Sequence, residues 1–204
     1  MTRAMEVAPS CVSRTVVLAA GAGRRLGGVA KALLRDQNGE SFLSLIAARA
    51  QAAAAPIAVV VVAEPHREAT EQEARRLGLD TVLNPRPEQG MASSVAVGFG
   101  ASQGWSWDAA LLWPVDHAAV TLASVQMVVD AGDADSIVVP TFHGRGGHPT
   151  SFGRVAWRDL ARCHTAESGA RWVLSRHAAC VIRLPVSDPG VRVDVDLPAD
   201  RGKL

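Results

Sequence analysis

Short apolar runs that are typical of strands follow one another along this chain, separated by longer segments with the pattern of helices. Apolar runs without polar alternation, such as IAVVVVA at 57–63, are typical of strands covered on both faces. Such runs predict strands at 15–20, 57–63, 80–83, 109–114, 136–139, 181–184 and 191–195. Alanine-rich or amphipathic segments, two of them with Ser41 or Thr121 as N-cap, predict helices at 41–55, 66–77, 91–101, 121–131, 155–162 and 168–176.

This alternation predicts a doubly wound α/β fold with three α/β/α layers and a mostly parallel sheet. We expect one domain at 15–204, preceded by a flexible lead-in at 1–14 that has no apolar signal core. Sheets of this kind bind ligands at the carboxyl ends of their strands, near the point where the strand order reverses. The loops that follow the strands are therefore the segments in which function is expected.

Charge and composition narrow the class of protein. The formal net charge is +1, from 21 Lys and Arg against 20 Asp and Glu, and no long basic run occurs. This balance argues against a nucleic-acid or membrane-surface partner. The apolar stretch at 52–63 is broken by Pro56 and is too short to span a membrane. Three widely separated cysteines without a CxxC motif favour a reducing, cytoplasmic location over a disulfide framework or a zinc site.

The most informative segment is the loop LAAGAGRRLG at 18–27, which Lys31 follows. Glycines let a backbone approach a ligand closely, and their amides can point at phosphate oxygens. Arg25 and Lys31 supply positive charge where a triphosphate needs it. Two other interpretations remain, a tight turn with solvated arginines and a dinucleotide-binding turn. The spacing G-x-G-x-x-x-G is one residue longer than the dinucleotide fingerprint, and the Gly-Lys-Ser/Thr of a Walker loop is missing.

Carboxylates follow two of the predicted strands. Asp116 ends the segment AALLWPVD, where an Asp close to a phosphate loop is well placed to hold Mg²⁺. The alternative is an Asp that caps a helix or a turn. Asp194 and Asp196 lie two residues apart and would face the same way on a strand, so the pattern does not separate them. Two carboxylates and Mg²⁺ form a minimal nucleotidyl-transfer site, in which the metal orients the α-phosphorus for in-line attack.

Six motifs carry a resemblance to a known family. They are LAAGAGRRLGGVAK (18–31), NPRPEQGMASS (84–94), PVDH (114–117), GHP (147–149), GAR (169–171) and DVDLPAD (194–200). In this order they resemble the motifs of the molybdenum cofactor nucleotidyltransferases, which have the nucleotide-diphospho-sugar transferase-like fold. The resemblance spans roughly residues 16–200.

The resemblance implies a role for each matching position. It implies NTP contacts at Leu18, Ala19, Ala20, Gly21, Gly23, Arg25, Lys31, Asn84, Gly90 and Ser94, the last three near the base or ribose. Arg25, Lys31 and Asp116 would be catalytic. Asp116 and Asp196 would bind Mg²⁺, and Gly147 and His148 would line the acceptor side.

The implied reaction joins CTP to molybdopterin-bound molybdenum and releases pyrophosphate. In this family the Ala19-Ala20-Gly21 form of the loop is associated with cytidylyl transfer, and the GHP and GAR motifs favour the same branch. The spacing of 27–31 is more typical of the guanylyl enzymes, and Ala118 replaces the usual Pro, so the choice between CTP and GTP stays open. A molybdoenzyme or its chaperone is the implied partner that would receive the finished cofactor.

Two alternatives keep part of this interpretation. One retains the chemistry but transfers GMP, or uses another phosphorylated acceptor such as a sugar phosphate. The other is a nucleotide-binding regulatory protein or chaperone without turnover. The presence of Arg25, Lys31, Asp116 and Asp196 argues against the second alternative.

Overall fold

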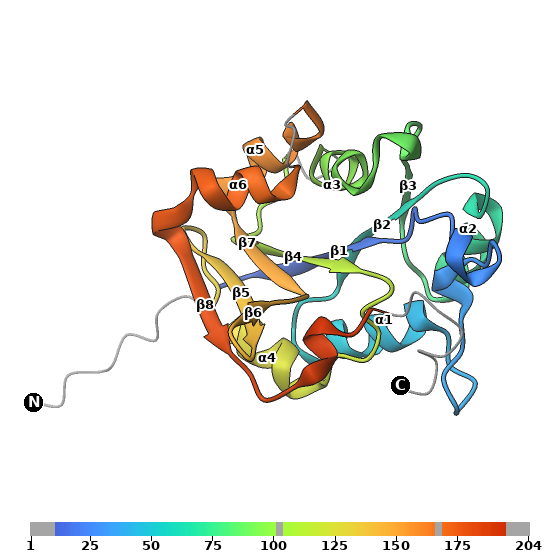
Figure 1. Cartoon of the computed structure of the whole chain (residues 1–204), viewed down its shortest axis with the longest axis horizontal. Helices are drawn as coiled ribbons and strands as arrows, with labels where there is room; N and C mark the ends of the chain where they lie inside the picture. The colour runs from blue at the N-terminus through green and yellow to red at the C-terminus, as the bar shows by residue number, and fades with distance from the viewer. Residues whose placement is uncertain (1–10, 101–103, 166–168, 195–204) are drawn as a thin grey trace, which may run out of the picture.

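A mostly parallel sheet forms the centre of the protein (Figure 1). The computed structural model describes residues 11–100, 104–165 and 169–194, without the side chains of Arg25 and Thr165. The strands are β1 (Ser13–Leu18), β2 (Ile57–Val62), β3 (Thr81–Leu83), β4 (Ala109–Pro114), β5 (Ile137–Phe142), β6 (Arg145–Gly146), β7 (Thr150–Gly153) and β8 (Val181–Pro185). The α-helices are α1 (Phe42–Ala52), α2 (Arg67–Arg76), α3 (Met91–Gly100), α4 (Leu122–Asp130), α5 (Arg154–Leu160) and α6 (Ala170–Arg176).

The strand order explains where ligands can bind. In the described residues the order is β3-β2-β1-β4-β7-β5-β6, and β8 pairs with β5. The strands β3, β2, β1 and β4 pair in parallel, as do β5 and β8, whereas β7 is antiparallel to both of its neighbours. The sequence order reverses between β1 and β4, which lie side by side. Their carboxyl ends therefore form the topological switch point where such folds bind ligands.

Helices cover both faces of the sheet, which confirms the expected three-layer α/β/α fold. In Figure 1, α3, α5 and α6 lie above the sheet and α1 and α4 lie below it. Each face has its own apolar core. Trp113 and Phe42 are fully buried in the lower core, and Phe99 packs edge-on against Phe152 in the upper core. The strands are apolar on both sides because both sides are covered.

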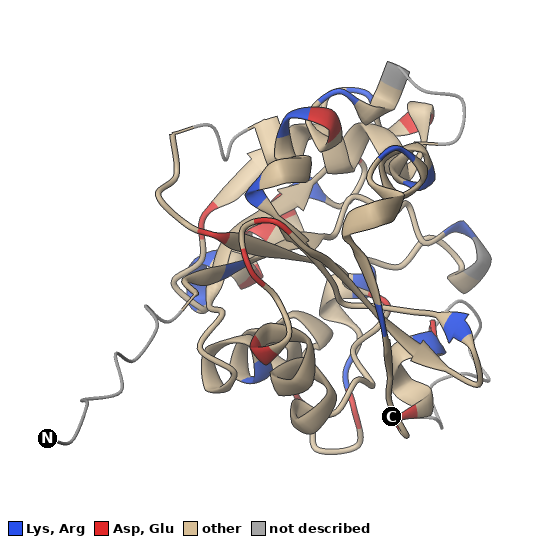
Figure 2. Ribbon diagram, turned by 90° about the vertical axis from the view of Figure 1, so that its left-hand side faces the viewer, with Lys and Arg blue, Asp and Glu red and all other residues tan. Residues whose placement is uncertain are grey.

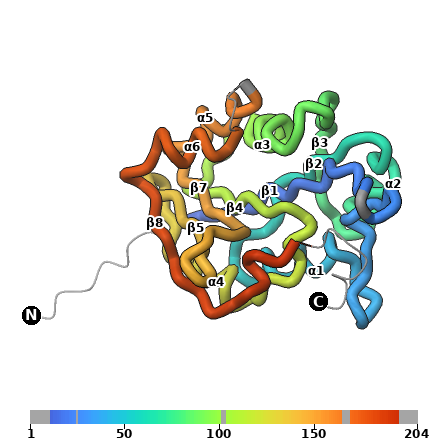
Figure 3. The backbone as a smooth tube through the Cα atoms, viewed as in Figure 1, coloured from blue at the N-terminus to red at the C-terminus, as the bar shows by residue number. Residues whose placement is uncertain are grey.

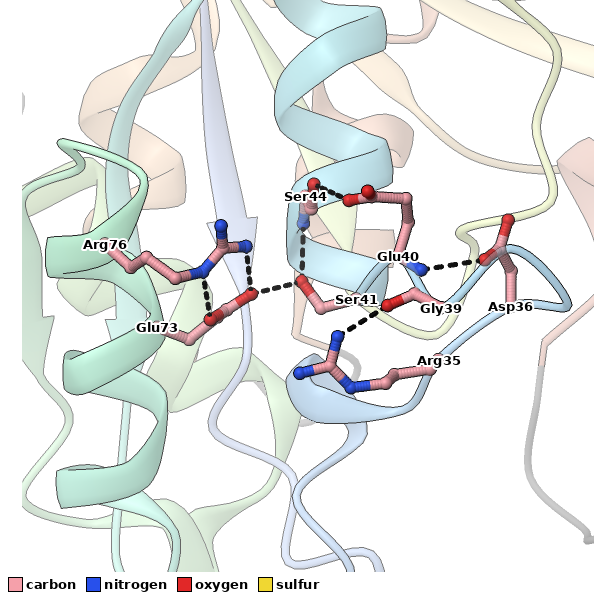
Figure 4. A network of polar contacts seen from close by, with 8 residues as sticks. All are labelled: Arg35, Asp36, Gly39, Glu40, Ser41, Ser44, Glu73 and Arg76. Carbon is pink, nitrogen blue, oxygen red and sulfur yellow. Dashed lines mark hydrogen bonds and ion pairs between the residues drawn. The ribbon is translucent and has the colours of Figure 1, made fainter.

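Helix starts follow the capping residues that the sequence contains. The Ser41 hydroxyl accepts a hydrogen bond from the Ser44 amide at 3.0 Å and so caps α1. The same hydroxyl donates to Oε1 of the buried Glu73 at 2.5 Å. Arg76 donates to both Glu73 oxygens at 2.8 Å, so one network joins α1 to α2 (Figure 4). Two hydrogen bonds from Arg76, opposed in part by burial and assisted by Ser41, lower the pKa of Glu73 to about 2.

Three segments differ from the sequence predictions. The sequence did not predict β7, an antiparallel strand that enters the sheet between β4 and β5. The predicted strand at 191–195 is wrong, because Pro189–Arg192 is a 3-10 helix whose Gly190 amide donates to the Asp188 carboxylate. The first strand starts at Ser13, within the expected lead-in, because Ser13 and Arg14 pair with β4.

Surface features agree with the balanced charge of the sequence. Lys and Arg, and Asp and Glu, are spread over helices and loops rather than gathered by sign (Figure 2). Within the described ranges, each helix is too short or too polar to cross a lipid bilayer.

Candidate active site

A cavity of about 740 Å³ opens at the carboxyl ends of β1 and β4. It lies at the switch point of the sheet, where Leu18 ends β1 and Pro114 ends β4. We refer to it as the first cavity. It is lined by Leu18, Ala20, Gly21, Ala22, Gly23, Arg24, Leu26, Lys31, Glu64, Pro65, Pro87, Glu88, Gly90, Met91, Ser94, Pro114, Val115, Asp116, His117 and Asp194.

The glycine-rich loop borders the first cavity as a tight turn. Gly23 has a φ of +58°, and a Cβ atom there would lie 2.0 Å from the Val29 carbonyl oxygen. The Gly23 carbonyl accepts hydrogen bonds from the amides of Leu26 at 2.9 Å and Gly28 at 3.0 Å. Gly21 is exposed, and a Cβ atom there would meet nothing within 4 Å. Gly23 is therefore needed for the turn itself, whereas Gly21 leaves space beside the cavity.

Lys31 and Asp116 form an ion pair inside the first cavity. Lys31 begins the 3-10 helix Lys31–Leu33, and Asp116 follows β4 by two residues. Their Nζ and Oδ2 atoms lie 2.8 Å apart, with the side chains 13% and 19% exposed. The pair is thus partly shielded but still reachable from the cavity. It brings a cation and a carboxylate together where a metal–triphosphate complex would need both.

A segment after β8 carries Asp194 to the same cavity. Figure 3 traces this red segment from β8 past α4 and back towards the centre of the molecule. Asp188 anchors it, because its carboxylate accepts hydrogen bonds from the Thr121 amide at 2.8 Å and the Thr121 hydroxyl at 2.9 Å. The His148 amide donates to the Val191 carbonyl at 2.8 Å. Asp194 lies three residues beyond this second anchor and lines the cavity. Asp196, the predicted ligand, lies outside the described residues.

Two histidines connect the first cavity to a second one. His117 lines the first cavity, His148 lines the second, and their ring centroids are 4.9 Å apart. Burial lowers the pKa of His148 to about 4, with a further lowering from His117. Burial also lowers the pKa of His117, although the Asp116 and Asp194 carboxylates oppose this change. These lowered pKa values favour the neutral form of both rings at neutral pH.

The second cavity is larger, about 1420 Å³, and lies between the upper helices and the sheet. Met91 lines both cavities, so the two adjoin at Met91 and at the histidine contact. Its lining comprises Gln89, Met91, Ala92, Val95, Leu112, Val139, Gly146, Gly147, His148, Thr150, Phe152, Gly169, Ala170, Arg171, Leu174, Ser175, Ala178, Val181 and Arg183. Two adjoining cavities can hold two reactants that meet at their junction.

A buried asparagine supports the loop between the two cavities. Asn84 is 1% exposed and its amide nitrogen donates to the hydroxyls of Ser93 at 2.9 Å and Ser94 at 3.0 Å. Its carbonyl oxygen accepts from the Arg86 amide at 2.9 Å. Ser93 in turn donates to the carbonyl of Gly90 at 2.8 Å. Asn84 thus shapes the loop that presents Gly90 and Ser94, and it does not line the cavity.

The structure brings most of the predicted NTP residues together. Leu18, Ala20, Gly21, Gly23, Lys31, Gly90, Ser94 and Asp116 line the first cavity, and Gly147 and His148 line the second. Ala19 is 7% exposed and, like Asn84, is not part of the lining. The Arg25 side chain lies outside the described part of the chain.

Sequence reasoning missed three charged residues of the first cavity, Arg24, Glu64 and Glu88. Arg24 belongs to the glycine-rich loop, next to the predicted Arg25, and is part of the lining. Glu64 also lines the cavity, and it follows β2 by two residues. The available signal was its position after the apolar run at 57–63, because carboxyl ends of parallel strands meet at one edge of the sheet.

Comparison with known proteins assigns the family. The profile of the MobA-like NTP transferase domain matches residues 15–181. A nucleotidyl transferase from Methanothermobacter thermautotroptrophicus superposes with a TM-score of 0.76 at 20% identity, covering 93% of this chain and 94% of that one. Rv0371c from Mycobacterium tuberculosis superposes with a TM-score of 0.75 at 25% identity, covering 96% and 98%. Its complex with manganese gives 0.72 at 25% identity, covering 94% and 96%. A search of curated proteins returned no significant match.

The chain belongs to the MobA-like NTP transferase domain family, because the profile covers most of its length. It is a nucleotidyltransferase with the three-layer fold of that class. The family resemblance that the six motifs indicated is therefore confirmed. The first cavity contains most of the residues for which that resemblance implied NTP contacts.

Proposed function

We propose that this protein transfers CMP from CTP to the phosphate of molybdenum–molybdopterin and releases pyrophosphate, with Mg²⁺ as cofactor. The observation that carries the proposal is the junction of two cavities at the His117–His148 contact. The first cavity has the glycine-rich loop, Lys31 and, among its carboxylates, Asp116 and Asp194, and the second has room for a bulky acceptor. Nucleotidyl transfer needs both reactants bound side by side.

The first cavity suits a nucleoside triphosphate. The open space at Gly21 would let the triphosphate approach the backbone, and Lys31 would offset its charge. Arg25, on the same loop, is proposed as a further cation for the phosphates. Gly90 and Ser94, across the cavity, would contact the ribose or the base.

Asp116 and Asp194 fit a Mg²⁺ site. Both line the first cavity, and both carboxylates act on the pKa of His117, so they face one region. Mg²⁺ is usually held by one or two carboxylates, with waters and substrate phosphates completing its shell. Carboxylate oxygens as the protein ligands suit Mg²⁺ better than zinc, which prefers Cys and His. Bound there, Mg²⁺ would offset phosphate charge and help to align the α-phosphate.

The chemical step needs positioning more than a strong base. An oxygen of the acceptor phosphate attacks the α-phosphorus of CTP, the new P–O bond forms, and the bond to the β-phosphate oxygen breaks. The second pKa of a phosphate monoester is about 6, so the nucleophile is already ionised at neutral pH. Neutral rings at His117 and His148 would border this oxygen without neutralising it. Lys31 would stabilise the charge that develops on the departing pyrophosphate.

The preference for CTP rests on the Ala19-Ala20-Gly21 form of the loop. A panel of CTP, GTP, ATP and UTP, each with molybdopterin cofactor and Mg²⁺, tests it through pyrophosphate release. We expect release with CTP alone. Release with GTP alone would retain the family chemistry and overturn the base assignment. Binding of CTP without release, with molybdopterin and with sugar phosphates, would favour a non-catalytic nucleotide-binding protein.

A further inference from the structure

The second cavity has an apolar body with two arginines in its lining. Its floor is the upper face of the sheet, with Leu112 from β4, Phe152 from β7, Val139 from β5 and Val181 from β8. Residues of α3 and α6, among them Val95 and Leu174, also line it. An apolar cavity bounded by a sheet and helices suits a ligand with a flat, extended body.

The charged groups of this cavity carry one sign. Arg171 from α6 and Arg183 from β8 line it, and the lining contains no Asp or Glu. In residues 11–100, 104–165 and 169–194, no carboxylate forms an ion pair with either guanidinium. Guanidinium groups bind oxygen acceptors such as carboxylates, phosphates and carbonyls through paired N–H donors. The lining therefore favours a ligand that presents oxygens to these two residues.

The strand order separates Arg183 from the proposed site of transfer. The first cavity lies at the end of β4, and β7, β5 and β8 follow in order across the sheet. Arg183 lies on β8, opposite Val139 of β5. Three strand spacings of about 4.8 Å place β8 roughly 14 Å from β4. His148 lies closer to β8 than β4 does, because the amide of the adjacent Gly147 donates to the carbonyl of Pro140 on β5, the strand that pairs with β8. A ligand that reaches from the histidine junction to Arg183 therefore spans about two strand spacings, roughly 10 Å, which is longer than a short sugar phosphate.

We propose that the acceptor has a second group of hydrogen-bond-accepting oxygens, remote from its reacting phosphate, and that Arg171 and Arg183 bind this group and determine acceptor specificity. The inference rests on the proposed function, since it names the acceptor as a phosphate monoester. The acceptor has an extended planar body that lies against Phe152 and Val139. Short phosphorylated sugars leave Arg183 without a partner and are poor acceptors.

A binding titration tests this without turnover. The probe is 6-carboxypterin, a planar fluorescent ring with a carboxylate, added to the full chain without CTP. We expect Arg183→Ala and Arg171→Ala each to weaken its binding about tenfold, because each removes a charge-assisted hydrogen bond. The matched control is Arg158→Ala, an exposed arginine of α5 outside both cavities, which should bind the probe as the wild type does. The inference would be overturned if the wild type and the three variants bound the probe equally, or if the wild type did not bind it.

Kinetics separate this inference from the proposed function. If molybdopterin is the acceptor, Arg183→Ala should raise its KM about tenfold and leave the KM for CTP unchanged. A rise in the KM for CTP instead would place Arg183 at the nucleotide and contradict the specificity role. If the wild type releases no pyrophosphate with molybdopterin, the proposed function fails, and the titration still decides the role of the two arginines.

Discussion

The Nζ atom of Lys31 lies 2.8 Å from Oδ2 of Asp116, although 85 residues separate them in the chain. One follows the glycine-rich loop and the other follows β4, so the ion pair joins the two strands of the switch point. Each side chain is less than one-fifth exposed, so the pair is less screened than a surface ion pair. Lys31 therefore orients the carboxylate that the proposed metal would use.

Asp116→Asn tests this carboxylate with little change in shape. We expect kcat for pyrophosphate release to fall about 100-fold or more, because an oriented charge at the reacting phosphates is lost. The matched control is Asp80→Asn, an exposed residue immediately before β3, which should keep wild-type activity. Thermal unfolding of both variants checks that the fold persists. Wild-type turnover by Asp116→Asn at ordinary Mg²⁺ concentrations would remove Asp116 from the proposed chemistry.

Two glycines of the loop should respond differently to alanine. At Gly23 the new Cβ would lie 2.0 Å from the Val29 carbonyl oxygen, with φ at +58°, so Gly23→Ala should lower the free energy of unfolding by about 1–3 kcal/mol. Gly21→Ala meets nothing within 4 Å, so its stability should stay within about 0.5 kcal/mol of wild type. Its KM for CTP should nevertheless rise, because the methyl group would stand between backbone and phosphates. Urea unfolding and steady-state kinetics of both variants measure these effects, and equal KM values for Gly21→Ala and wild type would contradict the proposed phosphate contact.

Glu73 should make stability depend on acid pH. Its pKa is 4.5 when unperturbed and about 2 in the folded protein, so the unfolded chain binds a proton more readily. The stabilising contribution is complete above about pH 4.5 and is lost as the pH falls towards 2. Glu73→Gln removes the ionised acceptor of Arg76, and we expect it to cost on the order of 2 kcal/mol at pH 7. Urea unfolding at several pH values should show that the difference in unfolding free energy between wild type and Glu73→Gln shrinks towards pH 3. A difference that stays constant with pH would refute the lowered pKa of Glu73.

Gly147 tests the close contact between the loop that carries Gly147 and His148 and the segment that carries Asp194. A Cβ atom there would lie 2.1 Å from the Val191 carbonyl oxygen, which also accepts the His148 amide. We expect Gly147→Ala to lower the free energy of unfolding by about 1–3 kcal/mol and to weaken Mn²⁺ binding, because the segment must move. Gly100→Ala, where a Cβ meets nothing within 4 Å, is the control. Calorimetric titration with Mn²⁺ gives the metal affinity, and unchanged affinity in Gly147→Ala would contradict the coupling of loop and segment.

Local patterns in the sequence were sufficient to predict much of the fold. The apolar runs that became β2 and β4 are covered on both faces, which is why they lack alternation. Ser41 and Thr121 cap α1 and α4 as expected, because a cap depends on residues within one turn. The glycine-rich loop and Asp116 indicated a phosphate and metal site, because each follows a strand that ends at the same edge of the sheet.

The sequence alone thus determined the layered α/β class, the capped starts of α1 and α4 and most of the predicted residues that line the first cavity, since these depend on residues close together in the chain. Tertiary structure decided the antiparallel insertion of β7, the 3-10 segment after β8 and the presence of a second cavity. Each depends on contacts between distant segments, such as Asp188 with Thr121 and His148 with Val191. The local pattern of the sequence does not predict such contacts, because they form only when the sheet brings distant segments of the chain together.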